Sequence, residues 1–254
     1  MTVKSDMEKS SQSYRNRLLE LLHPSDLDRL RQHLEPVVLE YRQSLYEANK
    51  PITSVYFPIE GVVSLVNTMA DGSTSEVGTI GNEGVVGLPV ILGDRLAPTS
   101  AYALPGTGLR VPADILTAEL ERSSRTRIVM LHYAHAFFNQ VAQSAACNHH
   151  HQIEQRCCRW LLMTHDRVHS DQFLLTQEFL GMMLGVRRTS VTEVAGELKH
   201  QKLIDYSRGL VTILNRSGLE KRACECYAVS KKEFDRLLGH PLGLRENLSD
   251  EVRL

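Results

Sequence analysis

Residues 175–194, LTQEFLGMMLGVRRTSVTEV, constrain the fold of this chain more than any other segment. Their pattern predicts two short helices joined by a tight turn at Gly185 and Val186. The second predicted helix begins with Arg187 and Arg188, which are followed by small polar residues. A helix-turn-helix uses this arrangement to place the N-terminus of its second helix in the DNA major groove. The segment therefore indicates DNA binding.

Helical periodicity divides the second predicted helix, residues 188–200, into two faces. Its apolar face is expected to be buried and consists of Val191, Val194, Ala195 and Leu198. The groove-facing set is predicted to be Arg188, Thr189, Ser190, Thr192 and Glu193. Arginine can make two hydrogen bonds to guanine, and glutamate can accept one from the cytosine amino group. The alternative is an amphipathic helix pair with an ordinary polar face.

Further basic and polar side chains near this helix are candidates for contacts with DNA phosphates. They are Gln177, Arg187, Lys199, Lys202 and Arg208. Residues 187–222 hold eight Lys and Arg against four Asp and Glu, although the whole chain has a net charge of −1. Residues 203–214 predict a hairpin, which would form the wing of a winged helix. The local charge is also compatible with an ordinary solvated face.

The first half of the chain shows a different pattern, in which short β-prone runs alternate with turn signals. We expect strands at 54–57, 62–68, 76–80, 101–104 and 108–111, with a hairpin turn at Asp71 and Gly72. Such spacing is typical of a β-sandwich or jelly roll. Helices are expected at residues 15–33, with a break at Pro24, and again from Pro112 onward. The fold class is therefore α+β.

Residues 125–146 predict one long helix with two apolar stripes. The first stripe has coiled-coil spacing and predicts a dimer interface through Ile128, Leu131, His135, Phe138, Ala142 and Ala145. The second stripe consists of Met130, Ala134, Phe137 and Val141 and would pack on the helix's own domain. The alternative is a core helix inside one domain. Another helix is expected at residues 152–168, and a last one at residues 217–238.

Length, composition and cysteine content place the chain among soluble proteins. No run of about 18 apolar residues predicts a membrane helix, and residues 1–14 lack an apolar signal-peptide core. We therefore expect a cytoplasmic protein without membrane association. The five cysteines, an odd number, indicate reduced thiols.

The cysteines and histidines suggest metal binding only weakly. Cys147, His149, His150, His151, Cys157 and Cys158 form the candidate metal set, and Cys224 and Cys226 are a similarly weak candidate for redox sensing. Consecutive residues on a helix point in different directions, so the metal set is not expected to converge on an ion. We predict a hinge near residue 147 and small core residues around it. No metal site and no cofactor are predicted.

Taken together, an N-terminal β-roll, a long helix and a C-terminal winged helix-turn-helix resemble the Crp–Fnr superfamily of bacterial transcription regulators. The resemblance covers residues 15–230. It implies a sensor domain at 15–146 that includes the dimer helix at 125–146, and a DNA-binding domain at 147–238. It also implies a homodimer that binds double-stranded DNA at a palindromic operator, with RNA polymerase as a further partner.

The region similar to the family's phosphate-binding cassette departs from the family pattern. Its candidate ligand residues are Gly84, Gly87, Leu88, Thr99 and Ser100. Leu88 and Thr99 stand where cyclic-nucleotide binders have a glutamate for the ribose and an arginine for the phosphate. Leucine cannot accept that hydrogen bond and threonine cannot neutralise that charge. The resemblance thus implies a regulator that does not depend on cyclic nucleotides, with an unidentified small-molecule effector as a possibility. No cysteine precedes Cys147, so the family's N-terminal iron–sulfur cluster is not expected.

No constellation typical of catalysis occurs, and we predict that the chain is not an enzyme. Two alternatives to a DNA-binding regulator remain. One is a ligand- or redox-sensing protein, with a metal or thiol near His149 and Cys157 and with secondary DNA binding. The other is a regulatory subunit of an enzyme complex, which the hairpin at 203–214 disfavours.

Overall fold

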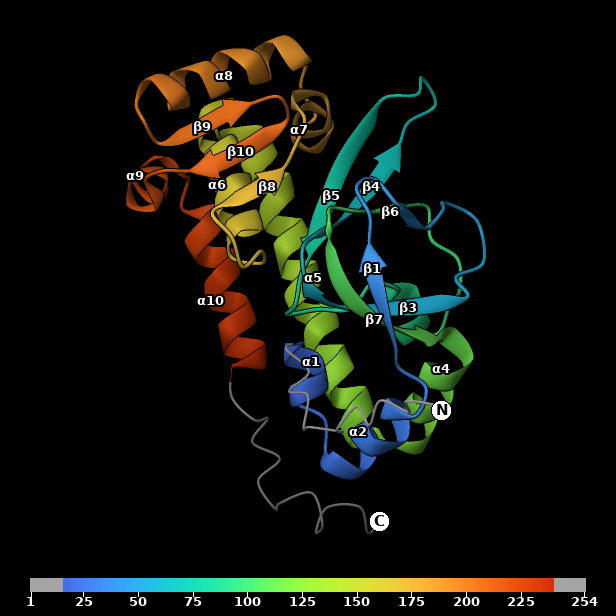
Figure 1. Cartoon of the computed structure of the whole chain (residues 1–254). Coiled ribbons are helices and arrows are strands. Elements are labelled where there is room, and N and C mark those ends of the chain that lie inside the picture. Colours follow the sequence, from blue (N-terminus) through green and yellow to red (C-terminus); the bar gives the residue numbers. More distant parts are fainter. Residues whose placement is uncertain (1–15, 240–254) are drawn as a thin grey trace, which may run out of the picture.

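A computed structural model describes residues 16–239. The chain forms a β-roll, a long helix that crosses the molecule, and a winged helix-turn-helix beside one end of the roll (Figure 1). Within these residues, no helix combines the length and the apolar character that a membrane crossing requires. The signal-peptide prediction for residues 1–14, and the predicted start of the first helix and domain at Arg15, lie outside the described residues.

The roll is built from two antiparallel sheets. One sheet has the order β1-β7-β3 and the other the order β2-β6-β4-β5. The strands are β1 (Glu35–Leu39), β2 (Ser44–Tyr46), β3 (Ser54–Glu60), β4 (Val63–Thr68), β5 (Thr74–Ile80), β6 (Ser100–Ala103) and β7 (Gly106–Pro112). All five expected strands are confirmed, as is the hairpin at Asp71 and Gly72 between β4 and β5. The sequence pattern did not predict β1, β2 or the short helix α3 (Leu88–Ile91).

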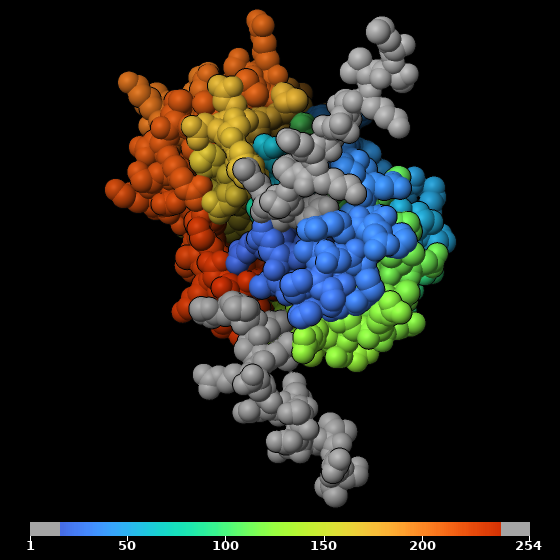
Figure 2. Space-filling view, turned by 60° about the horizontal axis from the view of Figure 1, so that its bottom comes forward, coloured from blue at the N-terminus to red at the C-terminus, as the bar shows by residue number. Residues whose placement is uncertain are grey.

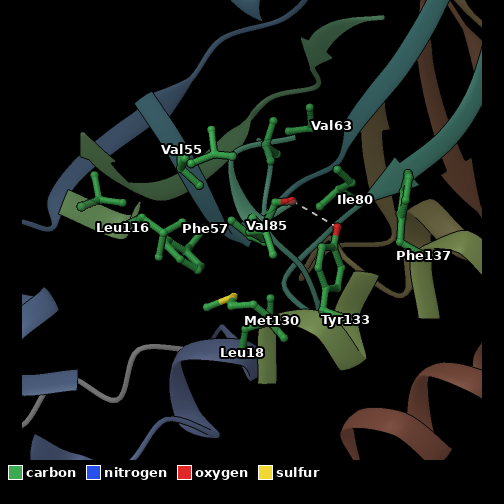
Figure 3. Packing of buried hydrophobic residues seen from close by; sticks show 14 of the residues in the cluster. Leu18, Val55, Phe57, Val63, Ile80, Val85, Leu116, Met130, Tyr133 and Phe137 are labelled. Atoms are coloured by element: carbon green, nitrogen blue, oxygen red, sulfur yellow. Dashed lines mark hydrogen bonds between the residues drawn. The ribbon is translucent and has the colours of Figure 1, made fainter. Parts of the chain in front are cut away.

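Apolar side chains from both sheets fill the roll, and the long helix α5 (Ser124–His150) closes it. Val55, Phe57, Ile80 and Val85 lie opposite Met130 and Tyr133 of that helix (Figure 3). Helices α1 (Arg17–Glu20) and α2 (Pro24–Arg31) precede the roll, and α4 (Ala113–Arg122) follows it. The predicted break at Pro24 is confirmed, because this proline is the first residue of α2, where its missing N–H is not needed.

Helix α5 (Ser124–His150) is four residues longer at its C-terminal end than the expected helix 125–146. The break expected around residues 147–151 lies at the C-terminal end of that region, where the chain bends at His151 and Gln152. Of the second apolar stripe, Met130 and Phe137 are buried and Val141 packs against the same core. The prediction that this stripe faces the helix's own domain is confirmed.

The winged part has its own hydrophobic core, which Trp160 of α6 and Phe179 of α7 share with several strand residues. Its elements are α6 (Ile153–His165), β8 (Gln172–Leu174), α7 (Gln177–Leu184), α8 (Arg188–His200), β9 (Ile204–Ser207), β10 (Leu210–Ile213) and α9 (Arg216–Arg222). Val62, Val66 and Leu104 of the roll belong to the same core. The winged part is thus packed directly against the roll.

The predicted single helix at residues 217–238 is wrong, because the chain breaks between α9 and α10 (Cys226–Leu238). Helix α10 then leaves the winged part and runs along α5 (Figure 1). Phe234, Leu237 and Leu238 join the core of the roll, and Asp235 pairs with Arg17 of α1 at 3.1 Å. The contact between α10 and the N-terminal helices is visible in Figure 2, where red meets blue. Helix α10 thus contacts both the winged part and the roll.

Candidate nucleic-acid interface

The turn between α7 and α8 has the geometry of a helix-turn-helix. Gly185 ends α7 in the left-handed conformation, with φ 62° and ψ 39°, which favours glycine. The Thr176 side chain accepts a hydrogen bond from the Phe179 amide at 3.1 Å and so caps the start of α7. A Cβ on Gly181 would stand 3.0 Å from the Val186 carbonyl oxygen, so glycine allows the turn to approach α7 closely. The predicted turn at Gly185 and Val186 is confirmed.

Helix α8 has the predicted bounds, and its two faces have the predicted exposure. Val191, Ala195 and Leu198 are buried, and Val194 is half-buried against the core of the winged part. Arg188, Thr189, Thr192 and Glu193 are exposed, and Ser190 is half-buried. The helix lies at the outer edge of the molecule, away from the roll (Figure 1). The predicted groove-facing set is therefore gathered on one accessible face.

A side-chain contact fixes the start of α7 relative to α8. The Thr192 hydroxyl donates to Gln177 Oε1 at 2.8 Å, and it also lies 3.0 Å from the Arg188 carbonyl oxygen. Gln177, which is predicted to contact a phosphate, thus already accepts a hydrogen bond within the helix-turn-helix. Arg187 is the N-cap of α8 and makes no capping hydrogen bond through its side chain within the described chain. The first amides of α8 are therefore available for an anion such as a DNA phosphate.

The predicted hairpin is confirmed and forms a wing of three strands. Strand β10 pairs with β9 and also with β8, which the sequence analysis missed. The two-residue turn has φ 50° at Arg208 and 78° at Gly209, the left-handed values of a tight hairpin turn. The Tyr206 hydroxyl donates to the Leu175 carbonyl oxygen at 2.6 Å, which ties the wing to the start of α7. Arg208 is thereby held at the tip of the wing.

A cleft of about 390 Å³ separates the start of α8 from the wing. It is lined by Thr176, Gln177, Glu178, Arg188, Tyr206, Arg208 and Gly209. Lys202 is exposed just beyond α8, in the left-handed conformation at φ 57°. Lys199 differs from the other predicted phosphate contacts because it pairs with Asp205 at 2.7 Å, which lowers the pKa of that carboxyl. A phosphate at Lys199 would have to compete with Asp205.

Hydrogen bonds and one buried ion pair hold the winged part against the roll. Tyr41 of the roll packs on Phe179, with ring centroids 5.8 Å apart, and its hydroxyl lies 3.1 Å from Thr176 Oγ1. Glu83 accepts from Arg167, which follows α6, at 2.7 Å and 3.1 Å. Burial alone would raise the pKa of Glu83, but the Arg167 charge and the hydrogen bonds from Arg167 and from the backbone together lower that pKa. The orientation of α8 is thus fixed by contacts across the two parts.

The predicted ligand residues of the cassette lie in the roll, where the backbone of residues 84–86 is already hydrogen-bonded. Gly84 donates to the Gly81 carbonyl, and Val86 exchanges hydrogen bonds with Tyr56 in both directions. The carbonyl of Val85 accepts from the Tyr133 hydroxyl at 3.1 Å (Figure 3).

The side chains around the cassette are likewise engaged or partly buried. Ser100 Oγ accepts from the Ala48 amide at 3.0 Å, and Leu88 and Thr99 are half-buried. A Cβ on Gly87 would stand 3.0 Å from the Val55 side chain. The cassette is therefore packed against the rest of the roll, with its polar groups bound within the chain.

The predicted dimer stripe forms the outward face of α5. Phe138 is 68% exposed and Leu131 is 43% exposed. His135, Ala142 and Ala145 are exposed as well, and Ile128 is half-buried. The opposite face of α5 lies in the core of the roll, so a single chain covers only one of the two apolar stripes. An apolar face of this kind lacks an apolar partner within the described chain.

Two family models match the chain. The model of the cyclic nucleotide-binding domain matches residues 36–123, and the model of the Crp-like helix-turn-helix domain matches residues 155–222. The two matches coincide with the roll and with the winged part. No curated protein sequence matches the chain.

Solved structures share this fold at low sequence identity. FixK2 from Bradyrhizobium japonicum has 15% identity and a TM-score of 0.64, over 75% of this chain and 98% of that one. A Crp/Fnr-family protein from Eubacterium rectale has 17% identity and a TM-score of 0.63, over 81% and 96%. TTHB099 of the CRP family from Thermus thermophilus has 16% identity and a TM-score of 0.62, over 74% and 96%.

Proposed function

The chain belongs to the Crp–Fnr superfamily of transcription regulators, and we propose that it binds a palindromic operator as a homodimer. The exposed polar face of α8 is the observation that carries this proposal. In the proposed complex α8 enters the major groove, and Arg188, Thr189 and Glu193 contact base edges. Arg187, Lys202 and Arg208 contact the flanking phosphates.

The outward face of α5 supports the homodimer. A stripe that includes Leu131 and Phe138 would be covered if two copies of α5 packed side by side. Contiguous exposed apolar surface is typical of interaction sites in soluble proteins. A two-fold axis between the helices would present two copies of α8 on the same side, so the operator should contain half-sites about one helical turn apart.

We further propose that the regulator does not depend on cyclic nucleotides. Leu88 and Thr99 lack the groups that would bind the ribose and the cyclic phosphate. The Tyr133 ring also lies close to the cassette, since a Cβ on Gly84 would stand 2.6 Å from Tyr133 Cε2. Calorimetry with cyclic AMP and cyclic GMP is expected to show no binding at physiological concentrations, and micromolar binding would overturn this part of the proposal.

Selection of bound sequences from a random pool of DNA duplexes tests the proposal directly. We expect a sequence with dyad symmetry, and RNA polymerase is the proposed partner of the protein once it is bound there. A selected sequence without a dyad would show that the homodimer is wrong. Repeating the selection with dialysed cell metabolites tests for an effector, which a tenfold change in affinity would reveal.

The dimer can be tested separately from the DNA contacts. Phe138→Lys places a charge in the desolvated stripe and is expected to shift the protein to monomer. Operator affinity should then fall by about 10²–10⁴-fold, because two linked DNA contacts gain from effective concentration. Leu92→Lys is the matched control, since Leu92 is a similarly exposed apolar residue on the roll. Sedimentation of both variants decides the matter, and a Phe138→Lys protein that stays dimeric would place the interface elsewhere.

A further inference from the structure

Four potential metal ligands meet where α5, α9 and α10 come together. Cys147 lies in the last turn of α5 and His151 is its C-cap, while Cys224 and Cys226 lie between α9 and the start of α10. Their three sulfur atoms and one imidazole nitrogen all lie within 4.8 Å of one another. The sulfurs of Cys147 and Cys224 are 3.5 Å apart, as are Cys226 Sγ and His151 Nδ1.

The two printed distances of 3.5 Å match those between the ligand atoms of a single tetrahedral ion, and all four atoms lie within 4.8 Å of one another. Zinc–sulfur bonds of about 2.3 Å and zinc–nitrogen bonds of about 2.0 Å place neighbouring ligand atoms about 3.5–3.8 Å apart. An iron–sulfur cluster spreads its cysteines over separate iron atoms and so needs a wider set. Three sulfurs and one imidazole are a ligand combination typical of structural zinc sites.

The groups around the four residues provide a second, independent observation. His151 Nδ1 faces the sulfurs, and its Nε2 lies 3.2 Å from a carboxylate oxygen of Glu225. Histidines that bind zinc are commonly held by a carboxylate on the other ring nitrogen. Gln143 Nε2 donates to Cys226 Sγ at 3.0 Å. The histidine is thus oriented with the nitrogen that would bind the ion toward the sulfurs.

The surroundings also compensate the charge that such a site would carry. Three thiolates and a neutral imidazole leave a zinc complex with one negative charge. The buried guanidinium of Arg159 interacts electrostatically with Cys147 and Cys224. Its Nη1 atom has no hydrogen-bond partner within the described residues, whereas Nη2 donates to Ser144. The positive charge of this buried side chain would thus offset part of the negative charge of the zinc complex.

The packing at this junction shows what an ion would contribute. Cys147, Cys224 and Cys226 form a small buried cluster separate from the two large cores. Cys157 and Cys158, in contrast, are ordinary members of the core of the winged part. The junction fixes the long helix relative to the winged part, yet little apolar packing supports it. A bound ion would join the end of α5 to the start of α10 at this point.

We propose that Cys147, His151, Cys224 and Cys226 form a structural zinc site that fastens the end of α5 to the start of α10. The sequence prediction of no metal site treated residues 147–158 and residues 224–226 as separate sets. In the structure, each of these two segments contributes two of the four ligands. The proposal does not depend on DNA binding, because zinc content is measured without DNA.

Metal analysis of the reduced, purified protein after dialysis tests the proposal. We expect one zinc ion per chain, and removal of zinc with a strong chelator should lower the Tm. Cys224→Ser should abolish zinc binding, whereas Cys157→Ser should retain it although both cysteines are buried. Cobalt in place of zinc should give the absorption of a tetrahedral thiolate complex in the control and not in Cys224→Ser.

Two further variants keep the proposal falsifiable if Cys224→Ser does not fold. His151→Asn removes a ligand on the partly exposed side of the cluster, with His150→Asn as its control. Glu225→Gln leaves all four ligands and should weaken zinc binding about 10–100-fold, as the loss of such outer partners does. A reduced wild type without stoichiometric zinc would overturn the proposal. A zinc-free protein with a disulfide between Cys147 and Cys224 would also overturn it.

Discussion

The outward face of α8 and the cassette at residues 84–92 both combine glycine with polar groups, yet these groups meet different partners. On α8, Arg188, Thr189 and Glu193 point away from the core of the winged part. In the cassette, the Gly84 carbonyl accepts from the buried Asn16 side chain at 2.9 Å, and the Val85 carbonyl accepts from Tyr133. The first segment offers its polar groups to another molecule, and the second binds its own chain.

The two segments differ because one keeps its polar groups exposed for binding and the other pairs them within the folded chain. A surface that binds DNA must keep its donors and acceptors exposed, so its side chains contribute little to folding. A loop with buried donors and acceptors must satisfy them internally, because unpaired buried polar groups are costly. Substitutions on α8 should therefore alter binding, and substitutions in the cassette should alter stability.

The buried pair of Arg167 and Glu83 offers the strongest test, because it joins the cassette side of the roll to the winged part. Arg167→Met leaves the Glu83 carboxylate buried without its cation, since both side chains are under 10% exposed. Loss of one partner of a buried ion pair costs about 3–5 kcal/mol. We expect denaturant unfolding to show a loss of this size in the free energy of unfolding.

The pH dependence of the same variant gives a sharper result. In the wild type the pKa of Glu83 is lowered in the folded state, so its contribution to stability is present above pH 4.5 and is lost as the pH falls. Without Arg167, burial raises the pKa of Glu83 above its ordinary value, and the variant should become more stable as the pH falls through that raised pKa toward 4.5. A difference between wild type and variant that stays constant with pH would contradict this account.

A smaller loss of stability is expected from Gly84→Ala in the cassette. The added Cβ would lie 2.6 Å from Tyr133 Cε2 and 2.7 Å from its hydroxyl oxygen. Tyr133 is fully buried and cannot move aside easily, so we expect a loss of about 1–3 kcal/mol from overpacking. Thermal unfolding measures this change. An unchanged Tm would mean that the cassette is loosely packed and has room for a ligand.

On the exposed face of α8, substitutions should change DNA binding and leave folding intact. Arg188→Ala is expected to cost roughly 1–3 kcal/mol of operator binding and to relax the preference at one base pair in each half-site. Lys202→Ala should weaken binding to all sequences alike and reduce its salt dependence, because it removes a phosphate contact. Fluorescence anisotropy over a range of salt concentrations distinguishes the two. Equal effects of Arg188→Ala on operator and random DNA would exclude a base contact.

The sequence predicted α8, its two faces and the wing because each depends on local pattern. Val191, Ala195 and Leu198 recur at helical spacing, and Gly185 and Gly209 mark the turns. The same reasoning gave five strands of the roll. It missed β1, β2 and β8, which are short or have few alternating residues, so that only pairing with distant strands reveals them.

Contacts between distant segments were beyond the reach of local pattern. The convergence of Cys147 and His151 with Cys224 and Cys226 depends on the path of α10, which turns back along α5. The ion pair between Lys199 and Asp205 depends on how strands β9 and β10 of the wing are paired. In each case the residue types were visible in the sequence, but their partners were set by tertiary structure.

The smallest expected effect comes from Gly196→Ala, the counterpart on α8 of Gly84→Ala. Gly196 lies within α8, and an added Cβ would meet no atom of the described chain within 4 Å. Alanine is favoured over glycine inside a helix by about 0.8–1.0 kcal/mol, so the variant should be more stable than the wild type. A gain of this size corresponds to a rise in Tm of roughly 2–4 °C in a protein of this length.

DNA binding by the same variant should change in the opposite direction. Gly196 shares the exposed face of α8 with Thr189 and Glu193, so its new methyl group would project toward the groove in the proposed complex. We therefore expect a protein that unfolds at a higher temperature and binds its operator less tightly. The same substitution would then stabilise the surface that binds DNA and destabilise the loop that binds its own chain. A higher Tm with unchanged operator affinity would show that DNA does not contact this part of α8, and the groove-facing set would have to shift toward the N-terminus of the helix.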